Sequence, residues 1–386
     1  MTARAEAARA LARILRGGAW SNVVVGGARD DEGRHVAALV LDALRTHGLA
    51  DVVLAGASGR PLARIQDEVL DLLRVAVGEL DRAHTPPEIV TSATVDAARE
   101  LGHGRAAGFV NGVLRSVVSS GLPDLAHAAR LGVPEWLRAS LRSAWGAEEA
   151  EAFWAASSQP ARVGLFGPSP PAGPHSAVSG LDGAWVADRP DPALQVIDPA
   201  SASVAVAVEA RPGERVLDLA AAPGGKTAIL AGAVGVGGLV VGADRHARRT
   251  KSAASRVGEA AWVRADGRRP PFGDATFDRV LLDAPCTGLG TLRRRPEILR
   301  RVQESEVERL SRLQGALLER ASALVKPGGR VVYSVCTVLP AETIDQVGDS
   351  WQAPDTVDLG RCWGNGRLLG PHLGPTDGMF IAVLDT

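Results

Sequence analysis

The stretch Val280–Gly288 (VLLDAPCTG) restricts the possible folds of this chain more than any other. It starts inside an apolar run, 277–282, and changes abruptly at Asp283 to a loop with a carboxylate, a proline and a thiol. A short apolar run that ends in this way predicts a buried strand of a parallel α/β sheet, with functional side chains at its carboxyl end. A second thiol, Cys336, ends another strand-like run, GRVVYSVCT. We therefore expect Asp283 and two thiols at the ends of sheet strands.

The hydrophobic pattern changes along the 386 residues, which are enough for two or three domains. Apolar residues at helical spacing predict an all-helical domain over 1–125. Residues 126–193 continue with amphipathic helices and then become rich in proline and glycine, which indicates a connecting segment. Over 194–386 strands alternate with helices, so a mainly parallel sheet is expected there.

Composition excludes several other classes of protein. No apolar run reaches membrane-spanning length without a charge or a glycine, so no membrane partner is expected. The first residues contain Glu6 and predict a helix rather than a transit peptide. Three cysteines, an odd number in a long chain, argue against a disulfide framework and favour a reducing cytoplasm. The net charge of −1 gives no overall signal for nucleic acid, and no metal site is expected.

A glycine-containing loop, Ala221–Thr227 (AAPGGKT), follows the predicted strand 215–220 and precedes a helix. Glycines at such a junction let a ligand approach the backbone amides at the helix N-terminus. The ending Gly-Lys-Thr is also that of a P-loop, but a P-loop requires glycine at position 220, where this chain has alanine. The G-x-G-x-x-G pattern of dinucleotide-binding proteins is also missing from this loop.

Aspartates end three successive predicted strands, at Asp244, Asp266 and Asp283. One aspartate at a strand end is ordinary turn chemistry, but three beside a glycine loop are harder to explain structurally. Asp244 is placed to hold two ribose hydroxyls, and Asp266 lies near an adenine edge. With Asp218 in the first strand, the pattern predicts an adenosyl ligand and a class I S-adenosylmethionine-dependent methyltransferase fold.

The two thiols indicate the substrate chemistry. Carbon 5 of a pyrimidine is too weakly nucleophilic to accept a methyl group directly. A thiolate that adds to carbon 6 makes carbon 5 enamine-like, and a carboxylic acid near ring nitrogen 3 stabilises the developing charge. A base must then remove the proton from carbon 5. The DAPC and SVCT motifs supply the groups that this reaction needs.

Five motifs in the catalytic half resemble, in order, those of the RNA 5-methylcytosine methyltransferases of the Sun type. They are LDLAAAPGGKT, GADRHAR, RADGRRPPF, LLDAPCTGLGTLRRRPEI and VYSVCTVLPAE. The segment Ala106–Arg115 (AAGFVNGVLR), with the preceding PPEIV turn, resembles the NusB-type helical RNA-binding domain. Together these parts resemble the members of the family that act on RNA of the bacterial small ribosomal subunit.

The resemblance implies a role for each matching residue. Cys336 is the implied nucleophile, and Cys286 assists proton removal or release of the methylated base. Asp283 contacts nitrogen 3 of cytosine and the methionine amino group, Asp244 the ribose and Asp266 the adenine. The methionine part of S-adenosylmethionine is cradled by backbone of the loop Ala220, Ala221, Ala222, Pro223, Gly224, Gly225 and Lys226. Cys362 lies outside any motif. DNA cytosine methyltransferases instead use the Pro-Cys thiol as nucleophile, and residue chemistry alone does not decide between the two thiols.

Three arginines follow the Cys286 loop, and several positions depart from the family pattern. We expect Arg293, Arg294 and Arg295 to meet RNA phosphates, because cations at a helix start are disfavoured by the helix dipole. The departures are Ala220 in place of a cysteine, Ile197 in place of a glutamine, Glu342-Thr343 in place of Glu-Asn, and the stretch Val163–Gly173. We expect these departures to affect RNA binding and the choice of target more than the methyl-transfer chemistry.

Two other functions stay open at this level. One is an amino-group methyltransferase, which needs an aromatic residue in the loop after the fourth strand rather than two thiols. The other is a non-catalytic RNA-binding or assembly factor with a vestigial fold, which the retention of Asp283, Cys286 and Cys336 disfavours. The chain is expected to act as a monomer on ribosomal RNA.

Overall fold

A computed structural model of the chain describes residues 1–27, 30–82, 85–123 and 130–386. Contacts divide it into two compact units. The first unit comprises Met1–Pro160 and Leu292–Arg301, and the second comprises Ala161–Thr291 and Val302–Thr386. The boundary expected at 125/126 lies outside the described residues, and the boundary at 193/194 stays a prediction.

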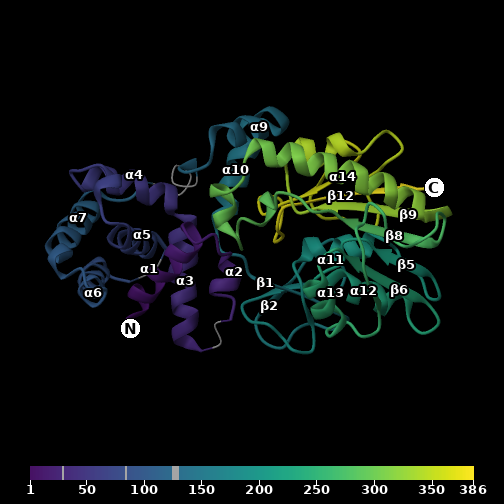
Figure 1. Ribbon diagram of the computed structural model, residues 1–386, viewed down its shortest axis with the longest axis horizontal. Helices are drawn as coiled ribbons and strands as arrows, with labels where there is room; N and C mark the ends of the chain where they lie inside the picture. The colour runs from purple at the N-terminus through teal and green to yellow at the C-terminus, as the bar shows by residue number, and fades with distance from the viewer. Residues whose placement is uncertain (28–29, 83–84, 124–129) are drawn as a thin grey trace. The chain divides into compact units, whose positions relative to one another are not determined.

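The first unit is helical, as the sequence predicts. Its described helices are α1 (Ala3–Leu15), α2 (Ser21–Val24), α3 (Asp31–Arg45), α4 (His47–Ala57), α5 (Asp67–Arg82), α6 (Pro87–Glu100), α7 (Ala107–Ser120), α9 (Glu135–Trp145) and α10 (Ala147–Ser157). Helix α5 packs against both α1 and α3 (Figure 1). Leu72, Leu73 and Val77 of α5 are fully buried in the core. None of the helices in the described part of the chain is long and apolar enough to cross a bilayer.

The segment Leu292–Arg301 packs within the first unit although it follows a strand of the second unit in the chain. Arg45 donates a hydrogen bond of 2.8 Å to the carbonyl oxygen of Arg293, and a carboxylate oxygen of Glu297 accepts one of 2.9 Å from the amide of Ser21. The guanidinium of Arg301 lies 4.3 Å from the ring centroid of Trp20. The alternation of strands and helices in the sequence gives no sign of this placement.

The second unit contains an eight-stranded mixed sheet. Its strands are β5 (Arg215–Asp218), β6 (Leu239–Asp244), β7 (Ala261–Arg264), β8 (Phe277–Asp283), β9 (Val325–Val335), β10 (Arg361–Trp363), β11 (Gly366–Leu369) and β12 (Met379–Asp385). They are arranged in the order β10-β11-β12-β9-β8-β5-β6-β7. Neighbours from β9 to β7 are parallel, and β12, β11 and β10 add an antiparallel end. The expected α/β architecture with a mainly parallel sheet is confirmed.

Helices cover both faces of this sheet, which explains why its central strands are continuous apolar runs. Helices α11 (Pro199–Ala207), α12 (Gly225–Val234) and α13 (Ala247–Ala254) lie on one face, and α14 (Glu304–Leu324) lies on the other (Figure 1). Val280, Leu281 and Leu282 of β8 are fully buried between them. A smaller antiparallel sheet, ordered β2-β3-β1-β4, comes from β1 (Val163–Phe166), β2 (His175–Ala177), β3 (Ala184–Ala187) and β4 (Gln195–Val196).

The parallel register brings the predicted polar residues to one edge of the large sheet. Asp218 ends β5 opposite Leu281 of β8, and Asp283 ends β8 opposite Ser334 of β9. Asp244 ends β6, the next strand on the other side of β5. Carboxyl ends of parallel strands are where open α/β sheets bind ligands.

Candidate active site

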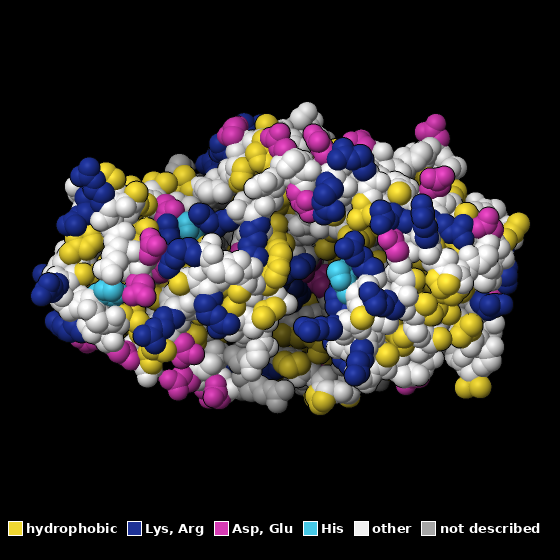
Figure 2. Space-filling view, viewed as in Figure 1, with side chains coloured by type: hydrophobic (Ala, Val, Ile, Leu, Met, Phe, Trp, Pro, Cys, Tyr) yellow, Lys and Arg dark blue, Asp and Glu magenta, His cyan; other side chains and the backbone are white. Residues whose placement is uncertain are grey.

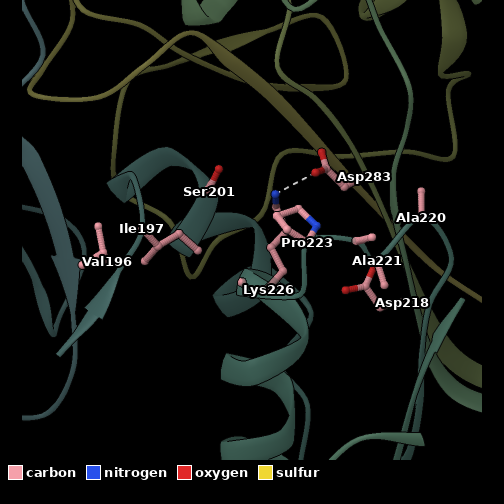
Figure 3. Close-up of a pocket in the computed structure, with 11 residues that line it drawn as sticks. Val196, Ile197, Ser201, Asp218, Ala220, Ala221, Pro223, Lys226 and Asp283 are labelled. Atoms are coloured by element: carbon pink, nitrogen blue, oxygen red, sulfur yellow. Dashed lines mark hydrogen bonds and ion pairs between the residues drawn. The ribbon is translucent and has the colours of Figure 1, made fainter. Parts of the chain in front are cut away.

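The loop between β5 and α12 forms a wall of a cavity of about 210 Å³ (Figure 3). The cavity is lined by Val196, Ile197, Ser201, Asp218, Ala220, Ala221, Ala222, Pro223, Gly225, Lys226 and Asp283. Gly224 has φ +100°, a conformation that side chains disfavour, and a Cβ atom there would lie 3.2 Å from Cγ2 of Val257. The loop therefore needs glycine to present its backbone in this way.

Asp218 presents an unsatisfied oxygen to the cavity. Its carboxylate is 1% exposed, and the hydroxyl of Thr227 donates to Oδ2 at 2.7 Å. Oδ1 has no hydrogen-bond partner among the described residues. Burial raises the pKa of Asp218 to about 7, against the opposing effects of Thr227 and Lys226. A buried carboxylate oxygen without a partner is costly, so a ligand that donates a hydrogen bond would be stabilised here.

Lys226 and Asp283, which both line the cavity, form an ion pair. Nζ of Lys226 lies 2.7 Å from Oδ2 of Asp283 (Figure 3). The hydroxyl of Ser334 donates to Oδ1 of Asp283 at 2.9 Å. Burial lowers the pKa of Lys226, but attraction to Asp283, their hydrogen bond, and attraction to Asp218 and Cys336 outweigh it, so the net pKa is raised. The charged form of Lys226 is therefore favoured, and Cys336 is among the groups that attract this charge.

The two thiols meet although they come from different strands. Cys286 follows β8, Cys336 directly follows β9, and their sulfur atoms lie 3.4 Å apart within hydrogen-bond distance. The hydrogen bond with Cys336 is the main cause that raises the pKa of Cys286 well above its usual range, and burial and nearby Glu342 and Asp283 add to it. The neutral thiol form of Cys286 is therefore favoured, and either sulfur can be the donor in this contact.

A buried carboxylate, Glu342, ties the two thiol loops together. Oε1 accepts hydrogen bonds from the amide of Thr287 at 2.9 Å and from the side chain of Gln314 at 3.1 Å. Oε2 accepts from the hydroxyls of Thr287 at 2.6 Å and Thr337 at 3.0 Å. Thr287 follows Cys286 and Thr337 follows Cys336, so one carboxylate holds the residue next to each thiol. Glu342 is fully buried, and burial raises its pKa although these hydrogen bonds oppose the shift.

The two aspartates expected at the nucleoside end lie at the same sheet edge but do not line the cavity. Asp244 is buried and accepts a hydrogen bond of 2.8 Å from the amide of His246, with a guanidinium nitrogen of Arg249 at 3.6 Å. Asp266 is exposed and pairs with Arg268 at 2.6 Å. Hydrogen bonds from Arg268 lower the pKa of Asp266 to about 2. Asp266 is thus ionised and already engaged by an arginine.

The structure brings together most of the predicted loop residues. Ala220, Ala221, Ala222, Pro223, Gly225, Lys226 and Asp283 all line one cavity. Gly224 shapes the turn of this loop but does not line the cavity. Cys362 is exposed on β10, away from these residues in the sequence. The roles of all these residues in binding and catalysis stay proposals.

The arginines Arg293, Arg294 and Arg295 are half-buried in the first unit. The guanidinium of Arg293 donates a hydrogen bond of 3.2 Å to the carbonyl oxygen of Pro160. Arg293 therefore contributes a hydrogen bond to the packing of the first unit. The contact of this cluster with RNA phosphates stays a prediction.

Sequence reasoning did not assign a role to Glu342, Gln314 or Thr287. Glu342 was visible only as a family position six residues after Cys336 in a mostly apolar segment. Gln314 lies on α14, where helical spacing does not reveal which partner it meets. An acidic residue in an apolar context beside a reactive thiol is the signal that could have indicated this network.

Two family models match the chain. One, described as "16S rRNA methyltransferase RsmB/F", matches residues 205–385, and one described as "NusB family" matches residues 1–119. A ribosomal RNA small subunit methyltransferase B from Xanthomonas campestris pv. campestris is 32% identical, with 100% of this chain and 97% of that protein covered. The putative methyltransferase Rv1407 from Mycobacterium tuberculosis is 36% identical over 88% of this chain and 85% of that protein.

Solved structures share the fold at lower sequence identity. The crystal structure of PH0851 superposes with a TM-score of 0.76 at 23% identity, covering 100% of this chain and 99% of that one. The crystal structure of NSun6 from Pyrococcus horikoshii with SFG gives a TM-score of 0.57 at 18% identity, covering 65% of this chain and 98% of that one.

The fold and the cavity define an S-adenosylmethionine-dependent methyltransferase with a helical N-terminal NusB domain. The cavity fits this cofactor because the glycine loop exposes backbone and because Oδ1 of Asp218 needs a hydrogen-bond donor. By its relatives and family models, the chain belongs to the RsmB/F family of 16S rRNA methyltransferases.

Proposed function

We propose that this protein methylates carbon 5 of a cytosine in RNA of the small ribosomal subunit, in the cytoplasm, through a covalent adduct between Cys336 and carbon 6. The observation that carries the proposal is the 3.4 Å contact between the sulfurs of Cys286 and Cys336, beside the Lys226–Asp283 ion pair. An amino-group methyltransferase has no need of two thiols in contact. Relatives described as ribosomal RNA small subunit methyltransferase B support the choice of RNA.

In the proposed reaction the thiolate of Cys336 attacks carbon 6 of cytosine. The new carbon–sulfur bond forms as the electron pair of the 5,6 double bond moves toward nitrogen 3, where Asp283 contacts the ring. The charge of Lys226 favours the thiolate before attack, because electrostatic attraction links it to Cys336. Carbon 5 thereby becomes nucleophilic.

S-adenosylmethionine supplies an electrophilic methyl group when bound. Carbon 5 takes that methyl group as the methyl–sulfur bond breaks and its electron pair stays on the donor sulfur, which leaves as a neutral thioether. A base then removes the proton from carbon 5. The electron pair of that carbon–hydrogen bond restores the double bond as the bond between carbon 6 and sulfur breaks. Cys286 assists proton removal or release, since its thiol lies against the sulfur that leaves.

The cavity proposed for the methionine part of the cofactor is made by Ala220–Lys226 and Asp283, with the ribose at Asp244 and the adenine near Asp266. The placement of the ribose at Asp244 is supported by the hydrogen bond from the amide of His246, which fixes the orientation of this buried carboxylate. The target base must leave its stack to meet Cys336. We propose that Arg293–Arg295 contact phosphates and that the protein acts as a monomer.

Bisulfite sequencing of 16S ribosomal RNA from a strain that lacks this protein tests the proposal. The expected result is loss of one methylated cytosine signal, restored by the wild-type gene. Mass spectrometry of the same RNA fragment must locate the methyl group on carbon 5. A methyl group on an exocyclic amine would contradict the reaction, and an unchanged methylation pattern with no cofactor binding in calorimetry would favour a non-catalytic assembly factor.

A further inference from the structure

We propose that helix α13 and the adjoining strand β7 form a phosphate-binding surface for the RNA substrate; this rests on the proposed function. The surface, here called the α13 basic surface, consists of Arg245, Arg248, Lys251, Arg256 and Arg264. All five side chains are on exposed residues of the second unit.

The local charge balance differs sharply from that of the whole chain. Residues 245–269 contain seven arginines and one lysine but only Glu259 and Asp266 as acids, whereas the full chain has a net charge of −1. Asp266 is engaged by Arg268. A general richness in arginine does not explain an excess confined to this stretch, which contains α13, β7 and the segments that flank them. A concentrated positive surface of this kind is typical of contact with a polyanion.

The geometry of α13 presents its cations on one side. Thr250 and Ala253 are the buried residues of this helix. Arg248 and Lys251 are three residues apart, so they are neighbours on the opposite, exposed side. Figure 2 shows Lys and Arg side chains gathered over the region that α13 occupies in Figure 1.

Strand β7 extends this surface. It is the edge strand of the large sheet, and α13 packs against it. Nε of Arg264 donates a hydrogen bond of 3.4 Å to the carbonyl oxygen of Arg245, just before α13, which directs this side chain toward the helix. The guanidinium of Arg264 keeps further donors for a phosphate.

These cations are available for a ligand. Within the described ranges, Arg248, Lys251 and Arg264 form no ion pair with a carboxylate. By contrast, Arg249 is turned to the carbonyl oxygen of Ala222 and toward Asp244, where it supports the glycine loop. Arg249 therefore supports the glycine loop, whereas Arg248 and Lys251 lie on the exposed side of the helix.

The position of the α13 basic surface suits an RNA strand that runs past the methyl donor proposed at the glycine loop. Helix α13 starts three residues after Asp244, at the same sheet edge as the glycine loop, because β5 and β6 are parallel. Phosphate contacts position a nucleic acid without reading its sequence. The α13 basic surface would thus hold the RNA backbone while the target base reaches the thiols.

Binding of a 16S RNA fragment over a series of salt concentrations tests this surface. The test variant carries Arg248→Gln, Lys251→Gln and Arg264→Gln. The matched control carries Arg189→Gln, Arg211→Gln and Arg312→Gln, which removes the same charge from exposed positions of the same unit. S-adenosylmethionine affinity, measured by calorimetry, reports whether each variant is folded.

The test variant is expected to bind the RNA at least about tenfold more weakly, with the slope of log K against log salt smaller by about two, since each lost phosphate contact removes about 0.7. Its KM for RNA should rise while kcat and cofactor affinity stay near wild type. An unchanged salt slope, or an equal loss in the control, would overturn the proposal. RNA binding is measured without methyl transfer. If the proposed methylation reaction were wrong, the wild-type protein would fail to methylate the RNA, and this result is independent of the binding comparison between the variants.

Discussion

The sulfur atoms of Cys286 and Cys336 lie 3.4 Å apart, although 50 residues separate them in the chain. Parallel pairing of β8 with β9 produces this contact, because it places the loops that follow both strands at one sheet edge. A proton can pass between two groups at this distance without movement of the backbone. In the proposed reaction the pair therefore works as one unit, in which Cys336 attacks and Cys286 assists.

Replacing Cys336 with serine should abolish methyl transfer, because a hydroxyl at neutral pH is a far weaker nucleophile than a thiolate. We expect the rate to fall by at least about 10⁴-fold, as for removal of other enzyme nucleophiles. Transfer of radiolabelled methyl groups to 16S RNA measures this. Cys362→Ser, at an exposed thiol on β10, is the control and should keep the wild-type rate. A Cys336→Ser protein with normal turnover would show that the nucleophile is wrongly assigned.

Replacing Cys286 with serine should let the adduct form but slow its breakdown, because the leaving sulfur then lacks its thiol partner. A protein–RNA species that survives denaturing electrophoresis is the expected result. The double variant Cys286→Ser/Cys336→Ser should give none. If Cys286→Ser turned over normally and no shifted band appeared, the release role would be excluded.

Glu342 should act as a positioning residue for the thiol loops. Glu342→Ala leaves the amide of Thr287 without its acceptor, which costs about 1–3 kcal/mol for a buried unsatisfied group, and leaves Gln314 with the carbonyl oxygen of Pro285 as its remaining acceptor. Misplaced thiols should lower kcat by about 100-fold while S-adenosylmethionine affinity stays unchanged.

Glu342→Gln is the matched rescue variant for this test. Its carbonyl oxygen can replace Oε1, and its amide can donate to the hydroxyls of Thr287 and Thr337, which are able to accept. Steady-state kinetics should therefore show recovery of most of the activity. A folded Glu342→Ala protein with wild-type kcat would contradict the positioning role.

Asp218 should make the stability of the protein depend on pH. Its pKa is raised from 3.8 to about 7 by burial, so the folded protein keeps a proton that the unfolded chain releases. This contribution to stability is complete below about pH 4 and is lost as the pH rises toward 7, by up to about 4 kcal/mol. Urea unfolding between pH 4 and 8 measures it, and Asp218→Asn should flatten the decline. Equal slopes for both proteins would show that Asp218 titrates normally.

Much of the site was predictable because each motif combines a strand with its terminal polar residue. Asp283, Cys286 and Cys336 were placed at strand ends from apolar runs alone, and the glycine loop from its position between a strand and a helix. The contact of Lys226 with Asp283 depends on where the first turn of α12 lies relative to the end of β8, which no local pattern encodes. The network of Glu342 needs a strand, a loop and α14 to meet, so it became visible only with tertiary structure.

The arginines illustrate the same limit. Arg293–Arg295 stood out as three cations beside the thiol loop, and yet the helical unit uses the segment that contains them for packing. The excess charge around α13 is spread over 25 residues and is diluted by apolar positions. It becomes a surface only when the helix and β7 lie side by side. Charge density in space, rather than along the chain, is the informative quantity for binding RNA.

Peptide mapping of the trapped Cys286→Ser adduct tests the central claim most directly. After nuclease and protease digestion, mass spectrometry should find a single linked peptide, with Cys336 joined to a cytidine that carries a methyl group. A link to any other residue, or a methylated cytidine formed by a protein that never becomes joined to RNA, would contradict the proposed reaction.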